Sequence, residues 1–136
     1  GLDIDTDFVI NTKLSEADGF DAMRHFMEME KTPTGIYCAN DITAIGMLKY
    51  LAKTRNRYYM PSIISSDGID EAQFTRPMLT TVEISKSDMG RFAIYLLLDR
   101  LRGGHSGVAR IELQCRLIRR ESCTPAEESR WCEYYI

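Results

Sequence analysis

The sequence has no apolar run long enough to cross a lipid bilayer, and it does not open on the charged-then-apolar pattern of a secretory signal peptide. It also has no excess of basic residues, since its net charge is −3. The chain as a whole therefore offers no electrostatic footprint for nucleic acid. Its densest basic runs, residues 53–57 and 116–120, are interpreted as solvated faces. These absences argue against a membrane protein and against direct DNA binding by this chain.

The four cysteines include no CxxC pair, and neither histidine stands at ligand spacing to a cysteine. Structural zinc is therefore not expected. Cys38 and Cys115 fall in apolar, strand-like runs and are predicted to be small buried hydrophobic residues. Cys123 and Cys132 could form a disulfide in an oxidising compartment, but without a secretory signal free thiols in a reducing cytoplasm are favoured.

The motifs of common enzyme classes are also missing. No histidine accompanies a serine or cysteine in a nucleophile motif, GxSxG is absent, and no glycine-rich phosphate loop follows a strand-like run. Asp41, Asp67 and Asp70 could in principle bind a metal, but they fit no recognised loop pattern. The sequence therefore predicts neither catalysis nor a metal, and no cofactor.

What the sequence does contain is an alternation of helical and strand-like patterns. Ser15 is a suitable N-cap for a helix over residues 15–29, and helical spacing returns over residues 41–53 and 86–101, where Ser87 is a possible N-cap. Short strands are predicted in three apolar runs and in one alternating run, at residues 33–39, 61–65, 79–84 and 109–118. A chain of 136 residues is long enough for one compact domain. The pattern favours an α/β fold on a mainly parallel sheet, with residues 124–136 as an exposed extension.

Polar residues follow two of these strands. Asn40 and Asp41 follow the first strand, and Asp67 follows the second. In open α/β sheets, ligands bind beyond the carboxyl ends of the strands, and short amide and carboxylate groups suit sugar hydroxyls. Structural roles are also open: Asp41 stands where an N-cap belongs, Asn40 can bond neighbouring backbone, and Asp67–Gly68 is a turn signal.

Four segments in order, "GLDIDTDFVINTKLSEADGFDAM", "PTGIYCANDITAIGMLKYL", "SIISSDGIDEAQFTRPMLTTVEISKSDMGRFAIYLLLDRLRGG" and "LQCRLIRRESC", resemble the effector-binding domain of the LacI/GalR family of bacterial transcriptional repressors. The resemblance covers about residues 1–123. It implies a periplasmic-binding-protein-like (type I) fold, in which two subdomains enclose a sugar-binding cleft. It further implies that this chain is the later half of that domain, without the helix-turn-helix headpiece. Residues 86–113 would then pack on the first subdomain, before the final strand returns to the second.

The resemblance also assigns residues. Asn40 and Asp67 match ligand contacts of the family, and Asp41 would cap the following helix. Three further positions of the site depart from the family's pattern. Leu14 and Ser66 each stand where the family has an aromatic residue, and Ile84 stands where it has a glutamine. Gly68 also replaces a second aspartate. The helix after Asn40 commonly carries the subunit interface, so three of its apolar residues are either interface or core: Ile45, Met47 and Leu48.

The expected function is therefore a cytoplasmic ligand-sensing domain that binds a sugar-like effector, acts as a homodimer or higher homo-oligomer, and reaches DNA only through the missing headpiece. A periplasmic sugar-binding protein of a transport system is the alternative from the same fold. An enzyme is a more distant one, since it needs a nucleophile-base pair that the sequence does not show.

Overall fold

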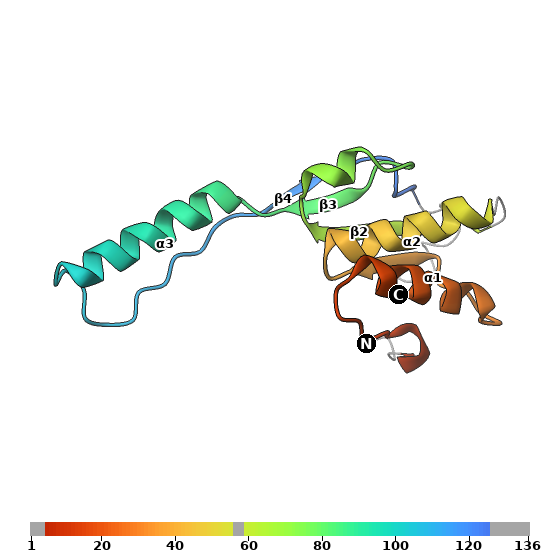
Figure 1. The fold of residues 1–136 in the computed structure, drawn as a ribbon, viewed down its shortest axis with the longest axis horizontal. Helices are drawn as coiled ribbons and strands as arrows, with labels where there is room; N and C mark the ends of the chain where they lie inside the picture. The colour runs from red at the N-terminus through yellow and green to blue at the C-terminus, as the bar shows by residue number, and fades with distance from the viewer. Residues whose placement is uncertain (1–4, 56–58, 126–136) are drawn as a thin grey trace, which may run out of the picture.

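The computed structural model describes residues 5–55 and 59–125. Most of the exposed extension predicted over residues 124–136 lies outside the described residues, and so does Cys132, the possible disulfide partner of Cys123. The described chain forms a four-stranded sheet with two helices on one side, and a third helix projects away from it (Figure 1).

The sheet has the strand order β1-β2-β3-β4. Strands β1 (Gly35–Cys38), β2 (Ser62–Asp67) and β3 (Thr80–Glu83) are parallel, and β4 (Arg116–Ile118) is antiparallel to β3. A helix connects β1 to β2, whereas the link from β2 to β3 contains only the short 3-10 helix η2 (Asp70–Gln73). The predicted α/β fold with a mainly parallel sheet is confirmed, and its parallel strands end at one common edge.

Helices α1 (Glu16–Glu28) and α2 (Asp41–Thr54) form the second layer, and the short 3-10 helix η1 (Thr6–Phe8) precedes them. The predicted cap of α1 is present: the Ser15 hydroxyl accepts from the Asp18 backbone N–H at 3.1 Å, and the Asp18 carboxylate accepts from the Ser15 backbone N–H at 3.4 Å. This reciprocal pair satisfies two N–H groups that a helix end would otherwise leave unbonded.

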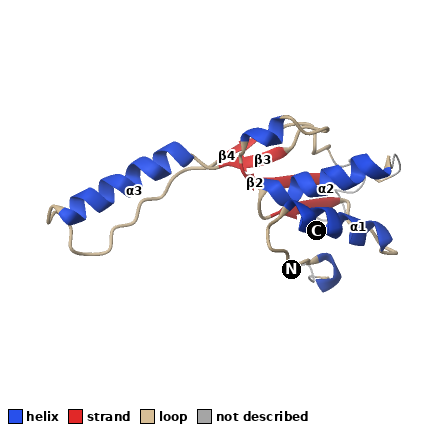
Figure 2. Ribbon diagram, in the orientation of Figure 1, coloured by secondary structure: helices blue, strands red, loops and turns tan. Residues whose placement is uncertain are grey.

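The core lies between the two helices and one face of the sheet (Figure 2). Alternate strand residues face it, so Ile36, Cys38 and Ile63 are buried against Met23 and Phe26 of α1 and the apolar residues of α2. The other face of the sheet is open: Tyr37 of β1 is 66% exposed and Leu117 of β4 is 57% exposed. This two-layer arrangement explains why the strands are half-buried.

Two glycines let the helices pack closely. A Cβ atom on Gly19 of α1 would lie 1.9 Å from the carbonyl oxygen of Thr43, and one on Gly46 of α2 would lie 2.0 Å from that of Glu16. Distances this short are not possible between non-bonded atoms, so any larger residue would separate the two helix backbones. The α1–α2 contact therefore depends on glycine at both positions.

Helix α3 (Lys86–Leu101) extends away from the sheet, and the chain then runs back along it to β4 (Figure 1). Across its described length none of its residues is buried. The predicted cap of this helix is corrected. The helix begins one residue before the predicted cap, with Ser85 at the N-cap position, so Ser87 lies inside the first turn. The Ser85 hydroxyl donates to the Asp88 carboxylate at 2.8 Å.

The strand predicted over residues 109–118 is present only at Arg116–Ile118. Residues 109–115 have alternating character but lie beyond the last pair of the β3–β4 ladder, and a strand needs a neighbour to satisfy its backbone groups. The predicted burial of Cys115 is therefore wrong, since this residue is exposed. The predicted burial of Cys38 is confirmed, at 3% exposure.

Within residues 5–55 and 59–125, no helix combines the length and the apolar character that crossing a membrane requires.

Candidate functional site

The carboxyl ends of β1, β2 and β3 meet at one edge of the sheet, and the predicted ligand residues follow them. Asn40 follows β1, Ser66 and Asp67 end β2, and Ile84 follows β3, while Leu14 precedes α1. Hydrogen bonds join four of these residues in two groups, Asn40 with Leu14 and Asp67 with Ile84, whereas the Ser66 hydroxyl bonds Tyr37. We call this set of five residues the polar edge.

Asn40 holds the first group together. Its side-chain oxygen accepts from the Thr43 backbone N–H at 3.0 Å, and its side-chain nitrogen donates to the carbonyl of Leu14 at 3.0 Å. The first bond makes Asn40 the N-cap of α2, and the second ties that cap to the segment before α1. The amide therefore fixes the relative position of Leu14 and the end of β1.

The prediction that Asp41 caps α2 is wrong. Asp41 is the first residue of the helix, and its side chain points into the protein, where it is 0% exposed. One carboxylate oxygen accepts from the hydroxyls of Ser65 at 2.5 Å and Thr81 at 2.6 Å, and the other accepts from the Ile69 backbone N–H at 2.8 Å. The helix begins one residue earlier than the sequence interpretation assumed, so Asn40 takes the capping role that was expected of Asp41, and Asp41 is buried instead.

Asp67 and Gly68 form the turn after β2, with positive φ values of 120° and 67°. The Gly68 backbone N–H donates to the Thr81 hydroxyl at 3.3 Å, and the Asp67 carbonyl accepts from the Ile84 backbone N–H at 3.4 Å. A Cβ atom on Gly68 would lie 2.7 Å from the Cα of Glu83, so only glycine fits beside the end of β3. The turn that carries Asp67 is therefore held closely against β3.

Leu14 and Ser66 complete the polar edge. Leu14 is 50% exposed and has a φ of 60°, a backbone conformation that is uncommon for residues other than glycine. The Ser66 hydroxyl lies 2.9 Å from the phenol oxygen of Tyr37 on the neighbouring strand. Sequence reasoning missed Tyr37, because its inclusion in an apolar strand run gave no sign that its side chain reaches the second strand end.

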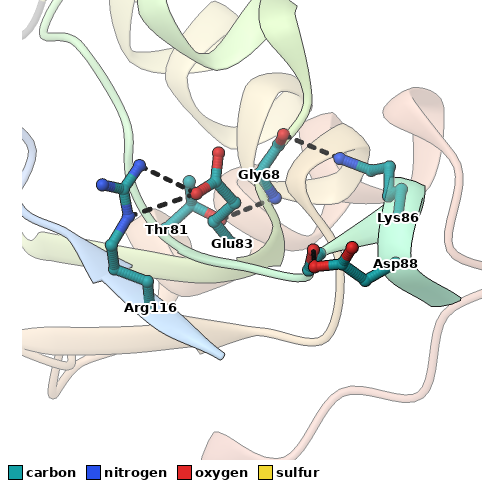
Figure 3. Close-up of polar contacts among 7 residues, drawn as sticks. Gly68, Thr81, Glu83, Lys86, Asp88 and Arg116 are labelled. Atoms are coloured by element: carbon teal, nitrogen blue, oxygen red, sulfur yellow. Dashed lines mark hydrogen bonds and ion pairs between the residues drawn. The ribbon is translucent and has the colours of Figure 1, made fainter. Parts of the chain in front are cut away.

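Charged residues beside the polar edge were also missed. The Lys86 ammonium donates to the carbonyl of Gly68 at 2.8 Å, and the Arg116 guanidinium donates to the Glu83 carboxylate at 2.9 and 3.2 Å (Figure 3). Figure 3 shows that these contacts lie where the chain leaves the sheet toward α3 and where it returns in β4. Neither pair stands at a spacing that a single helix or strand would reveal, so sequence patterns could not find them.

The polar edge offers hydrogen-bonding groups rather than reactive ones. Burial, with a smaller contribution from the Asp41 carboxylate, raises the pKa of the Cys38 thiol to about 12, which disfavours the thiolate that a nucleophile requires. Across residues 5–55 and 59–125, no group of three or more His, Cys, Asp or Glu side chains is placed to hold a metal ion. The arrangement can recognise a polar ligand through an amide, a carboxylate and hydroxyls.

Two surface cavities have volumes of about 240 and 270 Å³. The first lies beside β1 and α1 and adjoins the polar edge, since Tyr37, Ala39 and Thr43 are among its lining residues, and the second lies beside α2 near Pro77. The five residues of the polar edge line neither cavity.

The three apolar residues of α2 that were predicted as either interface or core are buried. Ile45 is 7% exposed, and Met47 and Leu48 are each 4% exposed. They pack in the core with α1 and the sheet. Because they offer almost no side-chain surface, their assignment to a dimer interface is corrected to the core.

The chain is similar to proteins of a known family. The model of a family described as periplasmic binding protein-like domain matches residues 1–123, which include the whole sheet and the polar edge. The chain belongs to this family. The fold implied by the resemblance is therefore confirmed for this periplasmic binding protein-like domain.

A curated relative is the HTH-type transcriptional repressor PurR of Haemophilus influenzae (strain Rd), which is 35% identical over 125 residues, covering 89% of the chain and 37% of the repressor. A solved LacI family regulator from Enterococcus faecalis V583 with bound ribose has a TM-score of 0.77 and 30% identity, over 87% of the chain and 44% of the regulator. Another, from Arthrobacter sp. FB24 in complex with lactose, has a TM-score of 0.71 and 29% identity, over 81% and 42%.

These relatives are LacI-family regulators, which confirms the resemblance to that family's effector-binding domain. The chain spans less than half the length of each of these relatives.

Proposed function

We propose that this domain is the ligand-sensing part of a bacterial DNA-binding transcriptional regulator, and that it binds a sugar-like effector at the polar edge. The observation that carries the proposal is the convergence of Asn40, Ser66 and Asp67 at one strand edge, held by hydrogen bonds that need no ligand. Rigid, short polar groups lose little entropy on binding, which suits recognition of a hydroxyl-rich ring. Similar regulators carry ribose or lactose in their solved structures.

In this proposal the polar edge is one wall of a cleft, and the other wall comes from a part of the protein outside this chain. The limited share of the relatives' length that the chain spans supports this division. Asn40 and Asp67 hydrogen-bond the ligand, while Leu14, Ser66 and Ile84 line the wall beside them. Residues 86–113 belong to the first subdomain, which covers the exposed apolar residues of α3: Met89, Phe92, Ile94, Tyr95, Leu97, Leu98 and Leu101.

The effector acts through its different affinities for two arrangements of the subdomains, and a homodimer or higher homo-oligomer passes that bias to a helix-turn-helix headpiece outside this chain. The protein works in the cytoplasm and is not an enzyme. A periplasmic sugar-binding protein of a transport system is the alternative. The repressor name of the PurR relative favours the regulator, and the complete gene separates the two, since an upstream helix-turn-helix supports the regulator and a signal peptide supports transport.

The test is Asp67→Ala in the complete gene product, titrated with ribose and with lactose by calorimetry. Each lost charge-assisted hydrogen bond is worth about 1.5–3 kcal/mol, so affinity for the sugar that binds should fall roughly tenfold or more. Operator binding without sugar should be unchanged. The matched control is Glu71→Ala, which removes an exposed carboxylate from η2 outside the polar edge. Equal sugar affinity of wild type and Asp67→Ala would remove Asp67 from the site. If the wild-type protein bound neither sugar, the result would count against both ribose and lactose as the effector.

A further inference from the structure

A buried carboxylate lies directly behind the polar edge. Asp41 is fully buried, and its two oxygens accept three hydrogen bonds from three different segments. Ser65 belongs to β2, Thr81 to β3, and Ile69 to the chain just after the Asp67–Gly68 turn. Since Asp41 itself begins α2, one side chain connects the helix, two strands and the turn.

Such a carboxylate is costly to bury unless its oxygens are bonded. Hydroxyl and backbone N–H donors surround it here, and its place at the N-terminus of α2 favours a negative charge. The neighbouring Thr43 shows the contrast: its hydroxyl is buried and has no hydrogen-bond partner in the described structure. The Asp41 network is therefore specific to Asp41, and is not shared by every polar group in the first turn of α2.

The network reaches both amides that follow Asp67. The Gly68 N–H donates to the Thr81 hydroxyl, which itself donates to Asp41, and the Ile69 N–H donates directly to Asp41. Asp67 has a φ of 120°, a conformation that a side-chain-bearing residue keeps only when its surroundings impose it. Bonds to two successive amides are one constraint of this kind, beside the contacts of the turn with β3.

We propose that Asp41 is a positioning residue of the ligand site: through Ile69 and Thr81 its carboxylate holds the turn that presents Asp67. Asp41 does not touch the ligand. The inference rests on the proposed function in so far as Asp67 binds the effector, but the mechanical link between Asp41 and the turn is a property of the chain itself. If Asp41 merely stabilised the core, its replacement would increase hydrogen exchange at all amides together.

Amide hydrogen exchange measured by NMR tests that link in this chain without a ligand. The Ile63 amide, which donates to Ser122 from the buried centre of β2, reports general opening. In Asp41→Ala, exchange at Ile69 should rise roughly 10- to 100-fold more than exchange at Ile63, because one charge-assisted bond is lost locally. Asp41→Asn should restore most of the protection, since a turned amide can accept from Ile69 and donate to the two hydroxyl oxygens.

Thr43→Val is the matched control, since it removes the unpartnered hydroxyl in the same helical turn and should leave Ile69 unchanged. If Asp41→Ala does not fold, Thr81→Val replaces it, with the Gly68 amide as the reporter, because this change removes the bond from Gly68 and the bond to Asp41. Exchange that rises equally at Ile63 and at the reporting amide of the variant that folds, Ile69 in Asp41→Ala or Gly68 in Thr81→Val, would overturn the proposal.

A ribose titration of the complete gene product then tests the consequence for binding. Asp41→Ala should weaken ribose binding at least about tenfold, with Asp41→Asn closer to wild type and Thr43→Val equal to it. Wild-type affinity in Asp41→Ala would overturn the positioning role. If the wild-type protein does not bind ribose, the proposed function fails for that sugar, while the exchange at Ile69 still decides whether Asp41 holds the turn.

Discussion

Replacing Gly46 by alanine should separate the two helices that cover the sheet. The added Cβ would lie 2.0 Å from the carbonyl oxygen of Glu16 and 2.9 Å from its carbonyl carbon and from the Phe20 nitrogen. All three atoms belong to the α1 backbone, so no side chain can rotate to make room. Because comfortable contacts are about 3.5 Å, the helices must move apart by more than about 1 Å along a well-packed interface.

The magnitude follows from two opposing effects. Overpacking of a core costs about 1–3 kcal/mol, and the rigid backbone neighbours here favour the upper end. Alanine is a better helix former than glycine by about 1 kcal/mol, which offsets part of that cost. The net loss of unfolding free energy is therefore about 2 kcal/mol. With a urea m-value of about 2 kcal/mol per molar, the unfolding midpoint should fall by about 1 M.

The assay is urea unfolding of both proteins, followed by far-UV circular dichroism, with Gly90→Ala as the control. Gly90 lies inside α3 with nothing within 4 Å of an added Cβ. Gly90→Ala should therefore raise helix content without lowering the midpoint. A Gly46→Ala protein with the wild-type midpoint, or a higher one, would refute the argument that close approach of α1 and α2 requires this glycine.

Two further predictions concern titration and thiol chemistry. The hydrogen bond from the Ser15 hydroxyl is the main cause that lowers the pKa of Asp18, so the folded protein favours the ionised carboxylate. The resulting stabilisation is present above the ordinary aspartate pKa and is lost as the pH falls through the lowered pKa of Asp18. The difference in urea midpoint between wild type and Asp18→Asn should thus be clear at pH 7 and shrink below about pH 4; a difference that did not change with pH would contradict this cause. Iodoacetamide at pH 8 should modify the exposed Cys115 long before Cys38, whose pKa burial raises to about 12, as mass spectrometry would show. Equal rates at the two thiols would mean that the Cys38 side chain is accessible.

The elements of this fold could be predicted because their patterns are local. The Ser15 side chain predicts the start of α1, and the short apolar run around Ile36 predicts a strand. Asn40 and Asp41 show the limit of that approach. Both are good N-cap residues, and a shift of one residue in the helix start decides which caps and which turns inward. The shift is set by Ser65, Thr81 and Ile69, all distant in sequence.

The strand predicted around Cys115 failed for a different reason. Alternation from Ile111 to Leu117 describes a surface that would be half-buried if a neighbour were present, but in the described structure only Arg116–Ile118 pairs with β3. Sequence patterns report what a segment is suited to contact, and they do not report whether the contact exists within the same chain. Asn40 and Asp67 were found because they follow predicted strands, and the other residues of the polar edge came from the family resemblance. Tyr37 and Lys86 reach the edge only through the assembled sheet.

The pairing of β3 with β4 makes residues 84–115, α3 included, an enlarged hairpin loop. The two strands are neighbours and antiparallel, and Glu83 opposite Arg116 is the last pair of their ladder. Loop-closure entropy grows only slowly with loop length, so the sheet is nearly indifferent to what the loop contains. The sheet, α1 and α2 should therefore keep their fold when a short turn replaces residues 84–115. A different insert at the same position should be tolerated for the same reason.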